Sequence, residues 1–173
     1  MSYRFYVRNQ TLQAIPVIVR PANKQDLKET ISQKWDSDWT SGAIHDQNYL
    51  LYSFRDALSG TLIALCAYED NPEGYCVRIV YGEAEPKSHP RLVAKREERR
   101  YTDIGKVIIA FGVQLSLESG YDGTVFFKAK TTELYHHYKR AFRAKDIFSE
   151  NYALIIYDEE AVAILNEFKE ETA

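Results

Sequence analysis

The sequence predicts one α/β (α+β) domain that spans residues 1–173. Its 173 residues are 45% hydrophobic and 13% aromatic, enough for one continuous core. No repeat, low-complexity tract or Pro/Gly/Ser-rich linker divides the chain. Short β-rich runs are interspersed with stretches whose apolar residues recur at helical spacing, which is typical of mixed folds in which helices flank a sheet.

The first strand is expected at Ala14–Arg20, where the run AIPVIVR ends at a proline. Asn23 and Asp26 then form the pattern of an N-terminal capping box, so a helix should begin there. An apolar stripe at roughly helical spacing continues it: Leu27, Ile31 and Trp35.

Three consecutive strands should follow as an antiparallel meander. Residues 49–70 hold two β-rich runs separated by a Leu-Ser-Gly turn signal, which predicts a hairpin. The third run, YCVRIVYGEAEP at residues 75–86, begins after the turn residues Asn71, Pro72 and Gly74.

The second half of the chain predicts a central βαβ unit. An amphipathic helix should stop near Gly120 and lead into the strand TVFFKAK, and its apolar stripe is Ile104, Val107, Ile108, Phe111 and Leu115. A helix through Leu134, Tyr138 and Phe142 comes next. A strand pair within residues 146–158 and a last helix behind a candidate Asp158 cap complete the chain, and the apolar face of that helix is Ala161, Ile164, Leu165 and Phe168.

Composition argues against several functional classes. The formal net charge of −3 gives no bulk reason to coat nucleic acid or an anionic membrane. The N-terminus lacks the apolar run of a signal peptide and no stretch is long enough to span a bilayer, so we expect a soluble, cytoplasmic protein with no membrane partner. Cys66 and Cys76 are interpreted as buried, reduced thiols. A metal site is not expected, because the neighbouring His136 and His137 would diverge by about 100° on a helix.

The stretch from Arg99 to Ala110 is the strongest candidate for a ligand site. It runs from a charged loop into the amphipathic helix, and the first N–H groups of a helix have no intrahelical partner. Together with the helix dipole they favour an anion such as a pyrophosphate. Gly105 would let the backbone approach closely, and Arg100 and Lys106 would supply charge. The alternative is an ordinary helix start.

These residues resemble the GCN5-related N-acetyltransferase (GNAT) superfamily. Members have a Gln/Arg-x-x-Gly-x-Gly/Ala loop at the start of the helix that holds the pyrophosphate of coenzyme A. Here that loop is matched by Arg100, Tyr101, Thr102, Asp103, Ile104 and Gly105. The order of elements is similar over nearly the whole chain, while the motifs lie between about Tyr75 and Lys145. The tryptophans in the segment 35–39 also resemble a poorly characterised bacterial branch.

The resemblance implies the GNAT fold, with a splayed strand pair, and acetyl-CoA as co-substrate without a metal. Residues 100–106, from Arg100 through Lys106, would bind the cofactor, and main-chain N–H groups near the end of the strand at 75–86 would hold its thioester. Two positions depart from the family: Asp103 stands in place of a glycine, and Arg143 stands where many members end the tyrosine helix with glycine. A relative without catalysis, or with another acyl donor, stays open.

Direct acetyl transfer to an amine needs a proton acceptor and a proton donor. Tyr138, which matches the family tyrosine beside the thioester, is the candidate general acid; its alternative role is core or interface packing. Glu83, or with less support Glu85, is the candidate base, against the alternative of an exposed edge carboxylate. The weaker candidates are histidines: His89, His136 and His137.

The expected acceptor is a primary amine of a small molecule or a peptide. A second hypothesis is a non-catalytic acyl-CoA-binding or interaction module. A third, an enzyme acting on aminoacyl-tRNA, would use the basic segment 87–100, although this segment lacks the interleaved aromatics of a single-strand platform. The tryptophan segment 35–39 is expected to border the acceptor cleft or else to close the core. A homodimer also stays open.

Overall fold

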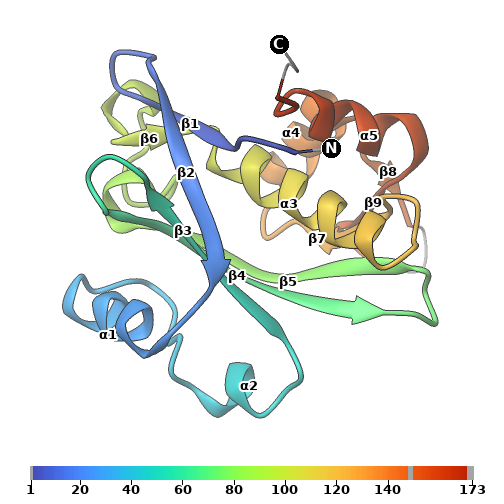
Figure 1. Ribbon diagram of the computed structural model, residues 1–173, viewed down its shortest axis with the longest axis horizontal. Helices are drawn as coiled ribbons and strands as arrows, with labels where there is room; N and C mark the ends of the chain where they lie inside the picture. The colour runs from blue at the N-terminus through green and yellow to red at the C-terminus, as the bar shows by residue number, and fades with distance from the viewer. Residues whose placement is uncertain (1, 148–149, 171–173) are drawn as a thin grey trace. The chain divides into compact units, whose positions relative to one another are not determined.

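The computed structural model describes residues 2–147 and 150–170 (Figure 1). The chain divides into two compact units. The first unit consists of Met1–Tyr3, Tyr68–Val80 and Ile108–Ala173, and the second consists of Arg4–Ala67 and Tyr81–Val107. Each unit is assembled from separate stretches of sequence. The expectation of one domain over residues 1–173 therefore stays a prediction.

The second unit is built on antiparallel strands. Strand β2 (Ala14–Pro21) pairs with β1 (Tyr6–Asn9) on one side and with β3 (Leu50–Asp56) on the other (Figure 1). The short β6 (Tyr101–Thr102) pairs with the outer side of β1. The unit also contains the start of β4 (Leu62–Asn71) and the end of β5 (Cys76–Ala84). Its apolar interior includes Val7, Phe54, Leu62, Ile63 and Leu65, all at most 1% exposed.

Helix α1 (Lys24–Ser32) begins as predicted, with a complete capping box between Asn23 and Asp26. The predicted apolar stripe is wrong, however. Ile31 is exposed and Trp35 lies beyond the end of the helix, whereas the buried positions of α1 are Asp26 and Thr30. The reason is a buried ion pair: the Arg55 guanidinium of β3 donates to Asp26 Oδ1 with its Nε at 3.1 Å.

The first unit contains a parallel and an antiparallel strand pair. Strand β7 (Val125–Lys128) runs parallel to β5, with Val77 opposite Val125 and Ile79 opposite Phe127. Strand β9 (Ala153–Ile156) pairs antiparallel with β7 and with β8 (Lys145–Asp146) (Figure 1). The fold class, mixed and mostly antiparallel with a central βαβ unit, is therefore confirmed. The predicted strand segment 146–158 includes residues 148 and 149, which lie outside the described residues.

Helix α3 (Ile104–Glu118) supplies residues to both units. In the first unit it packs on the sheet, where the Ile108 carbonyl accepts a 2.7 Å hydrogen bond from the Tyr68 hydroxyl. Gly112 allows close packing there, because an added Cβ would lie 3.2 Å from the Tyr68 ring and 3.4 Å from Val125, and these side chains would have to shift slightly. The helix is followed by Gly120 at φ +82°, so its predicted end is confirmed.

Two helices complete the first unit: α4 (Thr132–Phe142) and α5 (Asp158–Asn166). Helix α4 begins with a side-chain cap, because the Thr131 hydroxyl accepts from the Leu134 amide at 3.1 Å. The predicted Asp158 cap is wrong: Tyr157 is the N-cap residue, and Asp158 is the first helical residue, at φ +50°.

Several short elements carried no predictive pattern. They are β1, β6, α2 (Gly42–His45) and two 3-10 turns at Pro86–Ser88 and Arg96–Glu98. The two cysteines are buried free thiols, as expected. Within residues 2–147 and 150–170, the helices include none with the length and apolar character needed to cross a bilayer.

Candidate functional site

The helix-start loop, residues 100–106, links β6 to α3 in the second unit. Tyr101 and Thr102 form the strand, Asp103 turns the chain at φ +67°, and α3 begins at Ile104. The Val107 amide donates to the Asp103 carbonyl at 3.2 Å, so the amides of Ile104 and Gly105 precede the first intrahelical bond. The loop thus has the geometry expected of an anion-binding helix start.

Tyr101 anchors this loop and is not available to a ligand. Its amide donates to Ser88 Oγ at 2.9 Å and its hydroxyl donates to Asp56 Oδ2 at 2.6 Å. Burial, reinforced by Asp56, raises the pKa of the Tyr101 phenol. Burial also opposes ionisation of Asp56, but hydrogen bonds from Tyr101, Ser59 and Leu58 outweigh it and lower the pKa of that carboxyl.

The helix-start loop has an unsatisfied hydroxyl at Thr102 and open space beside Gly105. Thr102 is 9% exposed, and its buried hydroxyl has no hydrogen-bond partner among the described residues. A Cβ built on Gly105 would meet nothing within 4 Å. The protein's own packing therefore does not fill the side of the helix start at Gly105, and three residues earlier in the sequence a buried hydroxyl lacks the partner that such groups normally have.

The charges of the loop are paired within the second unit. Asp103, whose carboxylate would repel a phosphate, is 2.8 Å from the guanidinium of Arg96. Arg100 Nε lies 3.7 Å from Glu85 Oε1, and its amide donates to the Lys87 carbonyl at 3.1 Å. The Asp103 charge is thus partly neutralised, although 59% of the Arg96 side chain stays exposed. Lys106 is half-buried.

Glu83 and Glu85 are buried, so the alternative of exposed edge carboxylates is wrong. The backbone amides of Asp36 and Ser37 donate to the two carboxylate oxygens of Glu83, each at 3.0 Å. Glu85 accepts from the Lys87 amide at 2.9 Å and from the Ser88 hydroxyl at 2.7 Å. Each carboxylate at the end of β5 therefore fixes a neighbouring loop.

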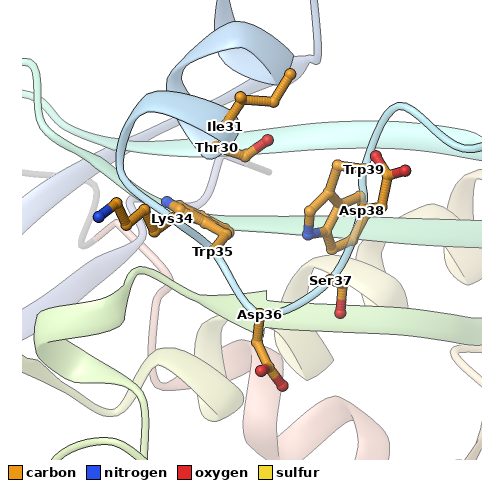
Figure 2. Close-up of a pocket in the computed structure, with 8 residues that line it drawn as sticks. All are labelled: Thr30, Ile31, Lys34, Trp35, Asp36, Ser37, Asp38 and Trp39. Atoms are coloured by element: carbon orange, nitrogen blue, oxygen red, sulfur yellow. The ribbon is translucent and has the colours of Figure 1, made fainter.

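Glu83 fixes the tryptophan loop, residues 35–39, which borders a hollow of about 300 Å³. The indoles of Trp35 and Trp39 lie on either side of this hollow, and Ile31 and Thr30 of α1 lie above them (Figure 2). Trp35 donates from Nε1 to Gln33 Oε1 at 3.2 Å, whereas the buried Trp39 Nε1 has no partner among the described residues. The tryptophans are thus buried and also line a cavity.

Tyr138 lies on α4, which belongs to the first unit, whereas the other predicted site residues belong to the second unit. Its ring packs edge-on against Phe127 at 5.1 Å and is stacked with Phe142 at 6.0 Å. It is half-buried. Arg143 ends α4 in the left-handed conformation at φ +54°. Asp103 and Arg143, the two positions where the resemblance led us to expect glycine, thus both adopt the backbone conformation that glycine favours.

Much of the positive charge of the basic segment 87–100 is bonded inside the second unit. Arg91 pairs with Asp36, and Arg99 donates to the Val93 carbonyl at 2.9 Å. Arg96 and Arg100 are paired as described above. The carboxylates and carbonyls that hold these guanidinium groups compete with an added polyanion.

The histidines do not gather into a site. His89 Nδ1 accepts from the Arg91 amide at 3.1 Å, while His136 and His137 pack against aromatic rings of α4. Across the described residues, no group of three or more His, Cys, Asp or Glu side chains is arranged to hold a metal ion.

The structure brings together residues that sequence reasoning did not connect. Ser88, Asp56 and Arg96 hold the helix-start loop, and no local pattern marks them, since their partners lie 13, 45 and 7 residues away. The orphan hydroxyl of Thr102 had no sequence signal either, because its burial depends on the pairing of β6 with β1.

Comparison with known proteins identifies the fold. No protein-family model matches the sequence, and no curated protein sequence matches it. Among solved structures, a chimera of spermidine N-acetyltransferase SpeG from Vibrio cholerae and hSSAT is similar, with 13% identity, a TM-score of 0.54, and 87% of this chain and 98% of that chain covered. A GNAT-family acetyltransferase from Listeria monocytogenes 4b F2365 has 10% identity and a TM-score of 0.50, with 82% and 93% covered.

Proposed function

From the fold that this chain shares with GNAT acetyltransferases, we propose that it is an acetyl-CoA-dependent N-acetyltransferase that acts on a primary amine. The observation that carries the proposal is the start of α3. There a buried hydroxyl without a partner, an open glycine and the first amides of a 15-residue helix occur within four consecutive residues, Thr102 to Gly105.

The residues of the helix-start loop fit a diphosphate. The Thr102 hydroxyl would donate to a phosphate oxygen, the Ile104 and Gly105 amides would donate alongside it, and Arg100 would contribute positive charge. The space beside Gly105 would let phosphate oxygens approach the backbone. Asp103 does not prevent this, because Arg96 already pairs with its carboxylate.

Acetyl-CoA supplies an activated acetyl thioester; the chain must orient it and move two protons. We assign Glu83 as the proton acceptor for the amine, directly or through a water. Its carboxylate is held by two backbone amides, and each oxygen keeps a further acceptor position. Tyr138 is assigned as the proton donor to the thiolate, with its ring orientation fixed by Phe127 and Phe142.

The transfer would pass directly from thioester to amine, without an acyl-enzyme. The acceptor is proposed to be the primary amine of a small molecule or of a peptide. The solved chimera has spermidine N-acetyltransferase in its name, which makes a polyamine one member of the first test panel.

The deciding experiment measures free thiol released from acetyl-CoA in the presence of a panel of primary amines. We expect release that depends on an amine, and a loss of about 10²-fold or more in kcat for Tyr138→Phe. Calorimetry with coenzyme A tests the loop separately, and no heat at millimolar coenzyme would refute the proposal. Binding without thiol release by any amine would favour a non-catalytic acyl-CoA-binding module instead.

A further inference from the structure

We propose that the hollow beside the tryptophan loop binds the acceptor amine through an apolar group and a carbonyl oxygen, with Trp39 Nε1–H as the hydrogen-bond donor. The substrate class would then be α-amino amides with an apolar side chain, the chemistry of a peptide N-terminus. This inference rests on the proposed transferase function for its biological meaning, but its physical content is a binding preference that can be measured without acetyl-CoA.

The Trp39 indole holds an unpaired donor. An indole N–H can only donate, and burying it without an acceptor is costly because the hydrogen bond to water is lost and not replaced. Trp39 is 1% exposed and its Nε1 has no partner among the described residues. In Figure 2 this nitrogen is on the side of the Trp39 indole that faces Trp35, across the hollow. An acceptor oxygen placed there would remove the cost.

The lining of the hollow is part apolar and part polar. The two indoles and Ile31 supply its apolar part, and in its polar part the Thr30 hydroxyl is already engaged with the Leu27 carbonyl at 2.6 Å. The hollow of about 300 Å³ is at the small end of ligand cavities. It suits one apolar side chain and one carbonyl group.

Three of the residues that line the hollow are charged: Lys34, Asp36 and Asp38. Figure 2 shows the ends of their side chains directed away from the space between the indoles. Asp36 pairs with Arg91, and hydrogen bonds from Thr40 lower the pKa of Asp38. The interior therefore offers no counter-charge to an ion, whereas the carboxylates outside it favour an amine that remains at the rim.

The hollow is also connected to Glu83, the proposed base. Glu83 accepts hydrogen bonds from the backbone amides of Asp36 and Ser37, two residues that line the hollow. A ligand whose side chain enters the hollow and whose amine stays at the rim is thus held beside the segment that Glu83 itself contacts. Binding and deprotonation would share one rigid support.

The test uses a built-in reporter, because Trp35 and Trp39 are the only tryptophans of the chain and both line the hollow. Leucinamide and 3-methylbutylamine have the same branched side chain and amine, but only leucinamide has a carbonyl oxygen. We expect both to change the intrinsic tryptophan emission on titration, with leucinamide binding about tenfold more tightly, the worth of one hydrogen bond to a buried donor.

Two variants assign the preference to one indole. Trp39→Phe removes the unpaired donor and should bring the two ligands to similar affinity. Trp35→Phe, the matched control, removes an indole whose N–H is already bonded to Gln33, and the preference should survive. If Trp39→Phe does not fold, the wild-type comparison still decides the question.

Equal affinities in the wild type, no emission change, or a preference that persists in Trp39→Phe would overturn the proposal. Because acetyl-CoA is absent from this titration, the result is independent of whether the chain releases thiol. A preference for leucinamide with no transferase activity would refute the proposed function and leave the ligand site standing.

Discussion

The tryptophan loop and the helix-start loop of the second unit share one design and differ in their chemistry. Each is fixed by a buried glutamate near the end of β5, Glu83 for the former and Glu85 for the latter through Ser88 and Arg100. Each also contains one buried polar atom without a partner, and these are the two such side-chain atoms found among the described residues. In the tryptophan loop the unpaired atom is an indole N–H beside a hollow lined by both tryptophans; in the helix-start loop it is a hydroxyl just before a helix N-terminus.

This difference separates two kinds of ligand. A buried donor beside a hollow lined by two indoles suits an uncharged acceptor group, whereas a hydroxyl beside helix amides and arginine side chains suits an anion. Because buried polar groups are almost always satisfied in native proteins, these two atoms are candidate contact points for a water or a ligand. The tryptophan loop and the helix-start loop can therefore serve as controls for each other in experiments.

The largest effect is expected for Glu83→Ala. The substitution leaves the buried amides of Asp36 and Ser37 without an acceptor, which should lower the free energy of unfolding by about 3 kcal/mol. It should also release the tryptophan loop and shift native tryptophan emission to longer wavelength. Urea unfolding and emission spectra measure both.

Glu85→Ala is the matched change for the other loop. It should lower stability by a similar amount while native emission stays at the wild-type wavelength, because Glu85 holds Lys87, Ser88 and Arg100 and not the tryptophans. If both variants shift the emission equally, the two loops are not held independently and the comparison fails.

Most of the architecture could be predicted from the sequence, because it depends on local periodicity and turn residues. The neighbouring strands β3, β4 and β5, the βαβ unit and the capping box at Asn23 all followed from patterns within a few residues. The wrong stripe on α1 has a non-local cause. Ile31 was expected inside and is exposed, because the distant Arg55 makes the buried face of α1 polar.

The sequence indicated candidate site segments but not the contacts that support them. The sequence indicated the helix-start loop and the tryptophan loop. It did not reveal the Glu83 contact to residues 36 and 37, which spans 46 to 47 positions of sequence. Nor did it show that Asp103 and Arg143 both adopt left-handed backbone, which aspartate tolerates well and arginine less well.

The next effect concerns pH and the anchor of the helix-start loop. The lowered pKa of Asp56 means that its carboxylate stabilises the fold fully above the unfolded pKa of about 3.9, and that this contribution is lost as pH falls through the folded pKa. Asp56→Asn should therefore cost about 1.5 kcal/mol at pH 7. Its urea midpoint should approach that of the wild type as pH falls below about 4. A difference that stays constant between pH 7 and pH 3 would contradict this account.

A pair of threonine substitutions compares an orphan hydroxyl with a satisfied one. Thr102→Val removes a buried hydroxyl without a partner and should raise the free energy of unfolding by about 1 kcal/mol. Thr30→Val removes the bond to the Leu27 carbonyl and should lower it by about the same amount. Thermal and urea unfolding of both variants give the signs.

The same pair tests the ligand side of the comparison. If the Thr102 hydroxyl contacts coenzyme A, Thr102→Val should weaken coenzyme binding about tenfold while Thr30→Val leaves it unchanged. A Thr102→Val protein that is destabilised and binds coenzyme normally would show that the hydroxyl has a partner within the fold.

The smallest effect is expected from Asp103→Asn. Asparagine accepts the left-handed backbone, so the change removes one charge and frees Arg96 with little strain. Because the ion pair is largely exposed, stability should change by less than about 0.5 kcal/mol. Coenzyme A affinity should rise about threefold at low salt, since a phosphate then meets Arg96 and no carboxylate, and the gain should fade at high salt as the charges are screened. The control is Glu97→Gln, which makes the same change of charge at an exposed position shortly before the loop. An equal gain in coenzyme A affinity there would mean that net charge, and not the Arg96–Asp103 pair, sets the affinity.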